Sequence, residues 1–204
     1  MQEIGVFCGT FNPIHWGHLL LAEYARDQYN LEKVLIVTSA IPPHRSDGII
    51  DAQFRHEMVK AACSQSPYFE SSSIELERAG PSYTVDTLRY FSRVYEDARL
   101  NLILGQDNLS QLKTWHQPEA LFSLCRILVA SRHSAITAAE IAADLPPQAQ
   151  VSVIDFPNIP VSSSMVRQRL REQRSVRFLV SPAVHDLLVG SGHYCQEQPS
   201  GKAP

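Results

Sequence analysis

The sequence lacks a surplus of basic residues, a long apolar segment and a secretory signal. Its 204 residues include 18 Lys and Arg against 21 Asp and Glu, a formal net charge of −3. A chain without a cationic surplus has no general attraction for a nucleic-acid backbone. No run reaches the roughly 18 apolar residues of a membrane-spanning helix, and the N-terminus has neither the basic nor the apolar region of a signal peptide. We therefore expect a cytoplasmic protein without nucleic-acid or membrane partners.

Closely spaced cysteines are also missing. The four cysteines lie far apart and form no Cys-x-x-Cys pair, which argues against a disulfide framework and a zinc knuckle. What the chain does contain is 44% hydrophobic and 19% charged residues, enough for a sizeable core. With no repeat or linker, the sequence predicts a single domain over residues 1–195. The residues at 196–204 continue no apolar pattern and are expected to be disordered.

Short apolar runs alternate with helical patterns along the chain. The expected strands cover residues 4–7, 34–37, 100–104, 127–130 and 150–156, and the expected helices cover 17–29, 52–64, 85–95, 163–172 and 182–189. A strand that is apolar at every position is typical of a parallel sheet covered on both faces. We therefore expect an α/β fold: a Rossmann-like parallel sheet with helices on both faces and a small C-terminal helical extension.

The loop after the first expected strand carries a glycine and two histidines. Gly9 follows the strand, and His15 and His18 lie where the next helix begins, spaced so that they share one face. The N-terminus of a helix attracts anions through its unpaired N–H groups and its dipole. Zinc ligation and a structural role are alternatives, but no cysteine pair or His-Glu-x-x-His motif supplies further zinc ligands. Phosphate binding is therefore favoured.

Five segments together resemble a known enzyme family. Residues 9–18, GTFNPIHWGH, resemble the nucleotide-binding signature of the nucleotidyltransferase superfamily, whose hallmark is a His-x-Gly-His loop. The other segments are similar to successive motifs of bacterial nicotinate mononucleotide adenylyltransferases: residues 42–45, 80–88, 105–115 and 161–167. The resemblance runs from residue 3 to residue 194 and covers nearly all of the chain.

The resemblance implies an ATP site built from both ends of the chain. It assigns this site to Gly9, Thr10, Phe11, His15, His18, Gly105, Asp107, Ser162, Ser163 and Arg167. The local chemistry agrees, because Ser162 and Ser163 suit a helix N-cap and Arg167 offers a forked set of donors one turn later. A plain helix cap is the alternative for the two serines and for Asp107.

The acceptor site that the resemblance implies contains His44, Arg45, Tyr83, Thr84 and Trp115. Backbone N–H groups at Tyr83 and Thr84, with the Thr84 hydroxyl, would bind a nicotinate carboxylate at a helix N-terminus. Trp115 would stack on the pyridine ring, and His44 and Arg45 would bind the 5′-phosphate. The alternatives are a core position for Trp115 and a solvated loop for His44 and Arg45.

The implied reaction is adenylyl transfer from ATP to nicotinate mononucleotide, a step of NAD biosynthesis that releases pyrophosphate. His15, His18 and Arg167 are the implied catalytic residues, and Mg²⁺ is the implied cofactor, held mainly by the ATP phosphates and not by side chains. The alternatives are a related transferase that uses nicotinamide mononucleotide or phosphopantetheine, and a non-catalytic nucleotide sensor. A homo-oligomer is compatible with the sequence.

The sequence departs from the family pattern at four positions. Cys8 stands where a second glycine is common, Asn12 where aspartate is common, Arg45 where lysine is common and Ser164 where threonine is common. We expect the Cys8 side chain near the phosphate path, and we expect Asn12 to change how the loop is held. Neither change removes a proposed phosphate ligand, so we expect the site to be intact.

Overall fold

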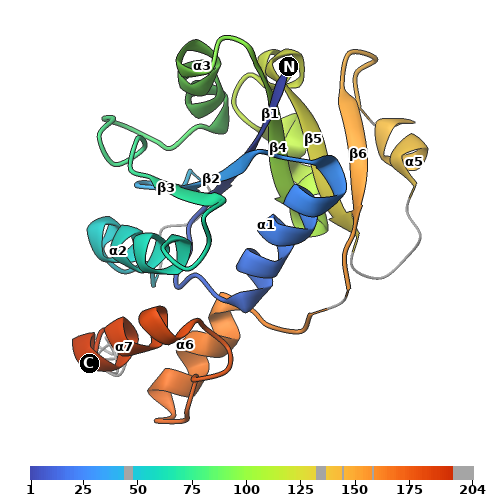
Figure 1. The fold of residues 1–204 in the computed structure, drawn as a ribbon. Helices are drawn as coiled ribbons and strands as arrows, with labels where there is room; N and C mark the ends of the chain where they lie inside the picture. Colours follow the sequence, from blue (N-terminus) through green and yellow to red (C-terminus); the bar gives the residue numbers. More distant parts are fainter. Residues whose placement is uncertain (44–47, 132–136, 144, 158, 195–204) are drawn as a thin grey trace, which may run out of the picture.

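The computed structural model describes residues 1–43, 48–131, 137–143, 145–157 and 159–194, and its centre is a six-stranded sheet (Figure 1). The strands are β1 (Gln2–Gly9), β2 (Lys33–Thr38), β3 (Phe69–Ser72), β4 (Ala98–Gly105), β5 (Cys125–Ser131) and β6 (Gln150–Asp155). They lie in the order β3-β2-β1-β4-β5-β6, and every neighbouring pair is parallel. The order reverses between β1 and β4, which confirms the predicted Rossmann-like fold.

Both faces of the sheet are apolar. In β2, the side chains of Val34 and Ile36 pack on one face, and those of Leu35 and Val37 pack on the other. Successive side chains of a strand point to opposite faces, so a strand apolar at every position can be buried on both sides. The described helices therefore cover both faces of the sheet.

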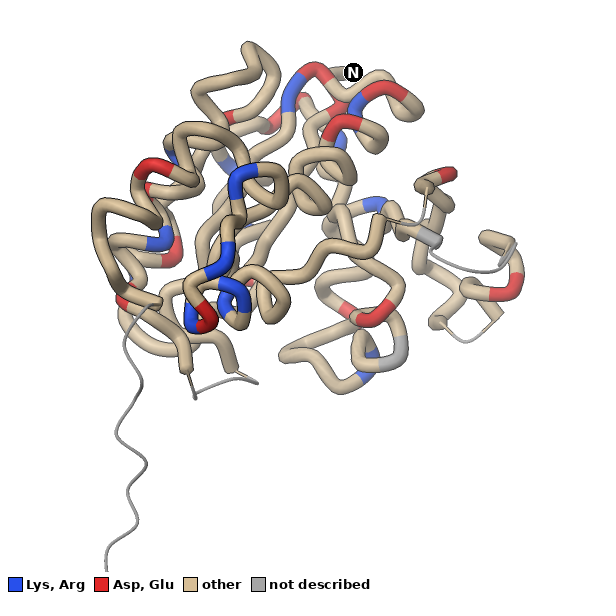
Figure 2. The backbone as a smooth tube through the Cα atoms, turned by 90° about the horizontal axis from the view of Figure 1, so that it is seen from below, with Lys and Arg blue, Asp and Glu red and all other residues tan. Residues whose placement is uncertain are grey.

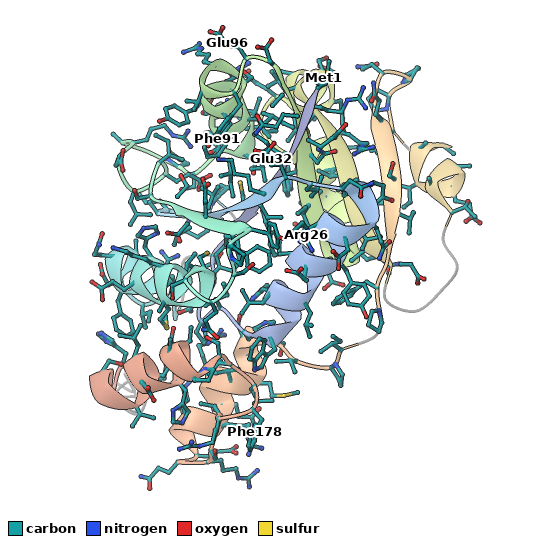
Figure 3. The ribbon with its side chains drawn as sticks, viewed as in Figure 1. Met1, Arg26, Glu32, Phe91, Glu96 and Phe178 are labelled. Carbon is teal, nitrogen blue, oxygen red and sulfur yellow. The ribbon has the colours of Figure 1, made fainter. Side chains whose placement is uncertain are left out.

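The helices divide between the two faces. The first set is α1 (Trp16–Tyr29), α2 (Ala52–Cys63), α6 (Ser163–Arg171) and α7 (Pro182–Ser191), and the second is α3 (Thr84–Val94), the 3-10 helix η1 (Gln106–Thr114), α4 (Pro118–Leu124) and α5 (Ala138–Ala143). Phe91 of α3 is buried, whereas Phe178, in the segment between α6 and α7, is 87% exposed (Figure 3). None of the helices in the described part of the chain has the length and apolar character needed to cross a membrane.

The C-terminal helices α6 and α7 pack where the strands end. Figure 1 shows them at the opposite end of the molecule from the N-terminus. The Trp16 N–H, at the start of α1, donates to the Leu179 carbonyl at 3.0 Å. Figure 2 shows acidic and basic residues mixed along the backbone, and α6 has Arg169 and Arg171 in its last turn. The predicted helical extension therefore lies against the first loop.

The sequence analysis did not predict four short elements, which are β3, η1, α4 and α5. β3 is a polar strand, Phe-Glu-Ser-Ser, at the edge of the sheet, and the three helices are too short or irregular to give a clear apolar stripe. Helix α7 also continues through Gly190 and ends at Gly192, whose φ of 64° is easily adopted by glycine. The expected tail at 196–204 lies outside the described residues.

Candidate active site

The predicted phosphate loop begins at the carboxyl end of β1, beside β4, where the strand order reverses. Gly9 is the last residue of β1, and Gly105 is the last residue of the neighbouring β4. Open parallel sheets bind ligands in the crevice outside the carboxyl ends of the strands, at this kind of reversal. The structure therefore brings two of the predicted ATP-binding segments to the carboxyl ends of neighbouring strands.

The loop between β1 and α1 folds back over its own first residue. A Cβ atom at Gly9 would lie 2.7 Å from Cζ of Phe11, closer than side-chain atoms normally approach. Phe11 is 3% exposed and has a φ of 45°, so its ring is buried under the loop while its backbone turns. Gly9 is therefore required for close packing of the loop.

Carbonyl oxygens of this loop accept hydrogen bonds from three other parts of the chain. The bonds are Ser39 N–H to Gly9 O at 2.9 Å, Arg55 Nη1 to Thr10 O at 2.6 Å, Arg167 Nη1 to Asn12 O at 2.8 Å and Ser163 Oγ to Pro13 O at 2.9 Å. In a peptide unit the C=O and N–H groups point in opposite directions. Fixing the carbonyl groups of Gly9, Thr10 and Pro13 therefore also fixes the direction of the N–H groups that follow them, whereas Asn12 precedes a proline, which has no N–H.

His15 and His18 form a stacked pair at the start of α1. Their ring centroids are 3.7 Å apart with an angle of 25° between the planes. The His15 N–H donates to Nδ1 of His18 at 3.3 Å, and His15 is 5% exposed. Because Nδ1 of His18 accepts a hydrogen bond, a neutral His18 carries its proton on Nε2. The predicted arrangement of both histidines on one face is confirmed.

The N-terminus of α6 docks on the same loop. Ser162 is its N-cap and accepts the Met165 N–H at 3.2 Å, as predicted for a capping serine. Ser163 binds the loop instead, through the Pro13 carbonyl, and Arg167 reaches it one turn later. These contacts join segments about 150 residues apart in the sequence. The structure therefore brings the predicted residues of the two phosphate motifs together.

Asn12 is held by side-chain contacts that explain its structural role. Its Oδ1 accepts the Tyr194 hydroxyl at 2.6 Å, and its Nδ2 donates to the Gly48 carbonyl at 2.9 Å. Burial raises the pKa of the Tyr194 hydroxyl, so that group is a neutral donor at physiological pH. Asn12 thus connects the first loop to the C-terminal segment, in agreement with the expectation that it affects how the loop is held.

On the acceptor side, the N-terminus of α3 is tied to the loop after β2. Tyr83 is the N-cap residue and Thr84 the first residue of α3. The buried Ser82 accepts the N–H groups of Ala40 and Ile41 on its Oγ, at 3.0 and 3.2 Å. The structure therefore holds the predicted carboxylate-binding turn against the end of β2.

Trp115 follows the last residue of η1 as its C-cap. It is partly buried against the core cluster that contains α3, and so is Tyr83. The neighbouring His116 stacks on Tyr83 with ring centroids 4.1 Å apart. Gln117 accepts a 2.6 Å hydrogen bond from Arg89 of α3. Trp115 is thus neither a fully buried core residue nor a free surface residue, and it lies on the same side as the predicted acceptor turn.

The remaining predicted positions vary in their placement. Asp107 is exposed in the first turn of η1. The N-cap residue of this helix is Gly105, so Asp107 does not have the capping position that was its alternative role. His44 and Arg45 lie outside the described residues.

The Cys8 side chain, expected beside the phosphate path, instead packs into the cluster around α3. Burial and the nearby charge of Glu75 raise the pKa of its thiol, which disfavours a reactive thiolate.

Two buried polar residues near the site were not identified from the sequence. Arg55 of α2 is 1% exposed, and burial lowers the pKa of its guanidinium. Glu75 is also 1% exposed, and its Oε1 accepts the Thr87 hydroxyl at 2.6 Å. A signal for Arg55 exists, because Met58, Val59 and Ala62 follow it at helical spacing and are buried on the same face.

The chain is similar to several known proteins. The model of the family described as cytidylyltransferase-like matches residues 6–169. A probable nicotinate-nucleotide adenylyltransferase of Dictyoglomus turgidum is 36% identical over 96% of this chain and 97% of its own. Another of that name, from Synechococcus sp., is 41% identical over 90% of both chains.

A solved structure resembles the fold at low identity. It is the nicotinic acid mononucleotide adenylyltransferase of Plasmodium falciparum complexed with NaAD, with a TM-score of 0.76 at 18% identity over 95% of this chain and 98% of that one. A likeness at this identity supports the fold. With the family match and the relatives above 30% identity over nearly the full length, it leads to one assignment. The chain belongs to the cytidylyltransferase-like family, together with relatives named nicotinate-nucleotide adenylyltransferase.

Proposed function

We propose that the protein transfers the adenylyl group of ATP to nicotinate mononucleotide, forming nicotinate adenine dinucleotide and pyrophosphate in NAD biosynthesis. The observation that carries this proposal is that the His15–His18 pair and the N-terminus of α6 meet on one loop, at the carboxyl ends of β1 and β4. Two anion-binding elements on one loop suit a polyphosphate. Near full-length similarity to relatives named for this reaction supports the acceptor.

In this reaction a phosphate oxygen of the mononucleotide attacks the α-phosphorus of ATP. The bond from the α-phosphorus to the oxygen that bridges it to the β-phosphorus breaks, and pyrophosphate leaves. The attacking phosphate is already ionised at neutral pH, so the chain needs neither a nucleophile of its own nor a strong general base. Its contribution is to align the two phosphates and to stabilise the negative charge that spreads in the transition state.

His15, His18 and Arg167 are the proposed catalytic residues. The Nε2–H of a neutral His18 is a suitable donor to a phosphate oxygen, and the hydrogen bond from His15 N–H favours that tautomer. Arg167 brings a permanent positive charge from α6 and is held to the loop through Asn12. The other proposed ATP ligands are the backbone of Gly9, Thr10 and Phe11, with Gly105, Asp107, Ser162 and Ser163.

Mg²⁺ is the proposed cofactor, and we propose that it enters the site bound to ATP. In the part of the chain that the structure describes, no group of three or more His, Cys, Asp or Glu side chains is placed to hold a metal ion. Mg²⁺ commonly keeps phosphate oxygens and water among its ligands. We propose that the ATP phosphates would hold it, and that it would supply positive charge to the departing pyrophosphate.

The proposed acceptor site contains Tyr83, Thr84 and Trp115, with His44 and Arg45 for the 5′-phosphate. N–H and hydroxyl donors at the start of α3 suit a carboxylate, whereas an amide also needs an acceptor group. This chemistry favours nicotinate over nicotinamide mononucleotide. We further propose that the reaction takes place in the cytoplasm without nucleic-acid or membrane partners. Light scattering of the purified protein will test whether it forms a homo-oligomer.

The decisive experiment is pyrophosphate release by the purified protein with ATP and Mg²⁺. Nicotinate mononucleotide, nicotinamide mononucleotide and phosphopantetheine are compared as acceptors at equal concentration. We expect a strong preference for the nicotinate form. Preference for another acceptor would retain the phosphate chemistry and reject the assigned acceptor site, and turnover with none of the three would support a nucleotide sensor.

A further inference from the structure

Arg55 makes four hydrogen bonds to backbone carbonyl oxygens around the active-site loops. Its Nη1 donates to Thr10 O at 2.6 Å and to Ser39 O at 2.7 Å, its Nη2 donates to Ala40 O at 3.2 Å, and its Nε donates to Ile50 O at 3.0 Å. The acceptors belong to the loop after β1, the loop after β2 and the segment before α2. One side chain of α2 therefore joins three segments that are separate in the sequence.

Burying a guanidinium group costs more free energy than burying a neutral side chain, because the charge loses its hydration. Arg55 is 1% exposed, so its charge has lost almost all contact with water. Burying a charge without a matching set of partners is strongly unfavourable. Here its hydrogen-bond partners in the described part of the chain are neutral carbonyl groups, and the nearby Asp51 offsets only part of the positive charge beneath the proposed phosphate loop. A positive charge in a low-dielectric region strengthens anion binding nearby.

The bond from Arg55 to Thr10 also sets the direction of a proposed phosphate donor. The Thr10 carbonyl and the Phe11 N–H belong to one peptide unit and point in opposite directions. Because the carbonyl points to Arg55, the Phe11 N–H points away from it. Hydrogen bonding of the carbonyl to a cation also polarises the peptide unit and makes its N–H a better donor.

The other bonds of Arg55 extend to the acceptor side. Ser39, which Arg55 holds through its carbonyl, donates its own N–H to Gly9 O at 2.9 Å. The next residues, Ala40 and Ile41, donate their N–H groups to Ser82 Oγ, just before the turn that begins α3. A continuous set of hydrogen bonds thus runs from the phosphate loop through Arg55 and residues 39–41 to the acceptor turn.

We propose that Arg55 is a positioning residue that orients the phosphate-binding N–H groups and sets the spacing between the ATP loop and the acceptor turn. This inference rests on the proposed adenylyl transfer. The two reacting phosphates must meet in line, and a misplacement of about 1 Å can lower a rate about a hundredfold. A residue that links both loops should affect both substrates, whereas a residue of one half should affect one.

The test compares Arg55→Lys with a matched control, Arg126→Lys. Lysine keeps the charge but cannot reach three segments with a forked donor set. Arg126 binds Asn101 Oδ1 at 2.7 Å and Glu3 Oε2 at 3.1 Å, near the starts of the strands and away from the candidate site. Steady-state pyrophosphate release is measured well below the unfolding temperature of every variant.

For Arg55→Lys we expect kcat/KM to fall about 30-fold or more for ATP and for nicotinate mononucleotide alike, with a lower kcat and both KM values raised. For Arg126→Lys we expect a lower Tm and kinetic constants within about twofold of wild type. An Arg55→Lys enzyme with wild-type kinetics and only a lower Tm would overturn the proposal. A wild-type enzyme that releases no pyrophosphate would instead reject the proposed function.

A measurement on the wild-type protein covers the case in which Arg55→Lys does not fold. The Arg55 Nε–H resonance is assigned by NMR and followed while an unreactive ATP analogue or nicotinate mononucleotide is added alone. The proposal expects the resonance to shift with each ligand, although neither is in the proposed position to touch Nε. A resonance that either ligand leaves unchanged at saturation would contradict a link between the two loops.

Discussion

The two halves of the candidate site are held in different ways. On the phosphate side, the carbonyl groups of the loop after β1 are bound by buried or partly buried donors from α2, α6 and the loop after β2. On the acceptor side, Trp115 is followed by an exposed His116 that stacks on Tyr83 and by an exposed hydrogen bond between Gln117 and Arg89. The first half is thus tied to the core by several segments, whereas the second combines the buried hydrogen bonds of Ser82 with contacts that are open to solvent.

This difference matches the chemistry that each half is proposed to perform. Stabilising a transition state requires donors already aimed at the developing charge, because reorganising them would cost energy in every turnover. Recognising a flat acceptor ring requires a stacking surface that tolerates small adjustments. We infer that substitutions on the phosphate side reduce kcat, and those on the acceptor side change KM or stability.

The largest expected effect follows loss of the proposed donor at His18. We expect His18→Ala to lower kcat about a hundredfold or more with little change in KM, because its hydrogen bond strengthens only as charge develops. Steady-state pyrophosphate release measures both constants. His18→Gln, which places an amide donor near the position of Nε2, should recover part of the loss. A raised KM with unchanged kcat would contradict the catalytic role.

The next effect concerns the support beneath the acceptor turn. We expect Thr87→Val to lower the free energy of unfolding by about 2 kcal/mol, because the buried Glu75 carboxylate loses the Thr87 hydroxyl. For a chain of this size the Tm should drop by about 4–8 °C in a thermal melt. Thr87→Ser keeps the hydroxyl and should stay close to wild type. Equal stability of the Val variant would show that this hydrogen bond contributes little.

A smaller effect is expected at the start of α3. Thr84→Ala should raise the KM for nicotinate mononucleotide about tenfold and leave kcat and the KM for ATP nearly unchanged, because one donor to the carboxylate is lost. Thr84→Ser serves as the control that retains the hydroxyl. A rise in the KM for ATP instead would mean that the two halves of the site are not separated as we describe.

The smallest effect is a pH dependence of stability at His56, beside the end of β2. Its Nδ1 lies 3.2 Å from Thr38 Oγ1, and burial, with a contribution from Lys60, lowers the pKa of His56 from 6.5. Below pH 6.5 the unfolded chain therefore binds this proton more readily than the folded protein, so the free energy of unfolding should decrease slightly as pH falls through and below that value. Urea unfolding at pH 7.5 and 5.5 tests this, and His56→Gln should show a smaller decrease.

Sequence patterns predicted those parts of the fold in which local periodicity reflects burial. β2 and β5 are apolar at nearly every position because helices cover both faces, and α3 has an apolar stripe because one face packs on the sheet. The edge strand β3 and the short helices η1 and α4 carry no such pattern. Their positions depend on partners distant in the sequence, which a local pattern does not contain.

The candidate site divides in the same way. His15 and His18 share one face because of their spacing on a helix, so the sequence alone predicted that they would act together. The contact of Arg167 with Asn12 and that of Ser163 with Pro13 join distant segments; the resemblance to a family suggested that the motifs meet, but the contacts themselves appear only in the structure. Neither approach tests the proposed roles of His44 and Arg45, which stay predictions.

The sequence by itself determined the α/β class and the parallel crossovers, because each depends on the spacing of residues within one element or turn. The same kind of local spacing underlies the prediction that the first loop binds anions. Only the tertiary structure decided the part played by Arg55, which looks like an ordinary helical arginine in the sequence. A guanidinium acquires its function from the carbonyl groups that converge on it, and here those groups come from three loops that meet only when the sheet is assembled.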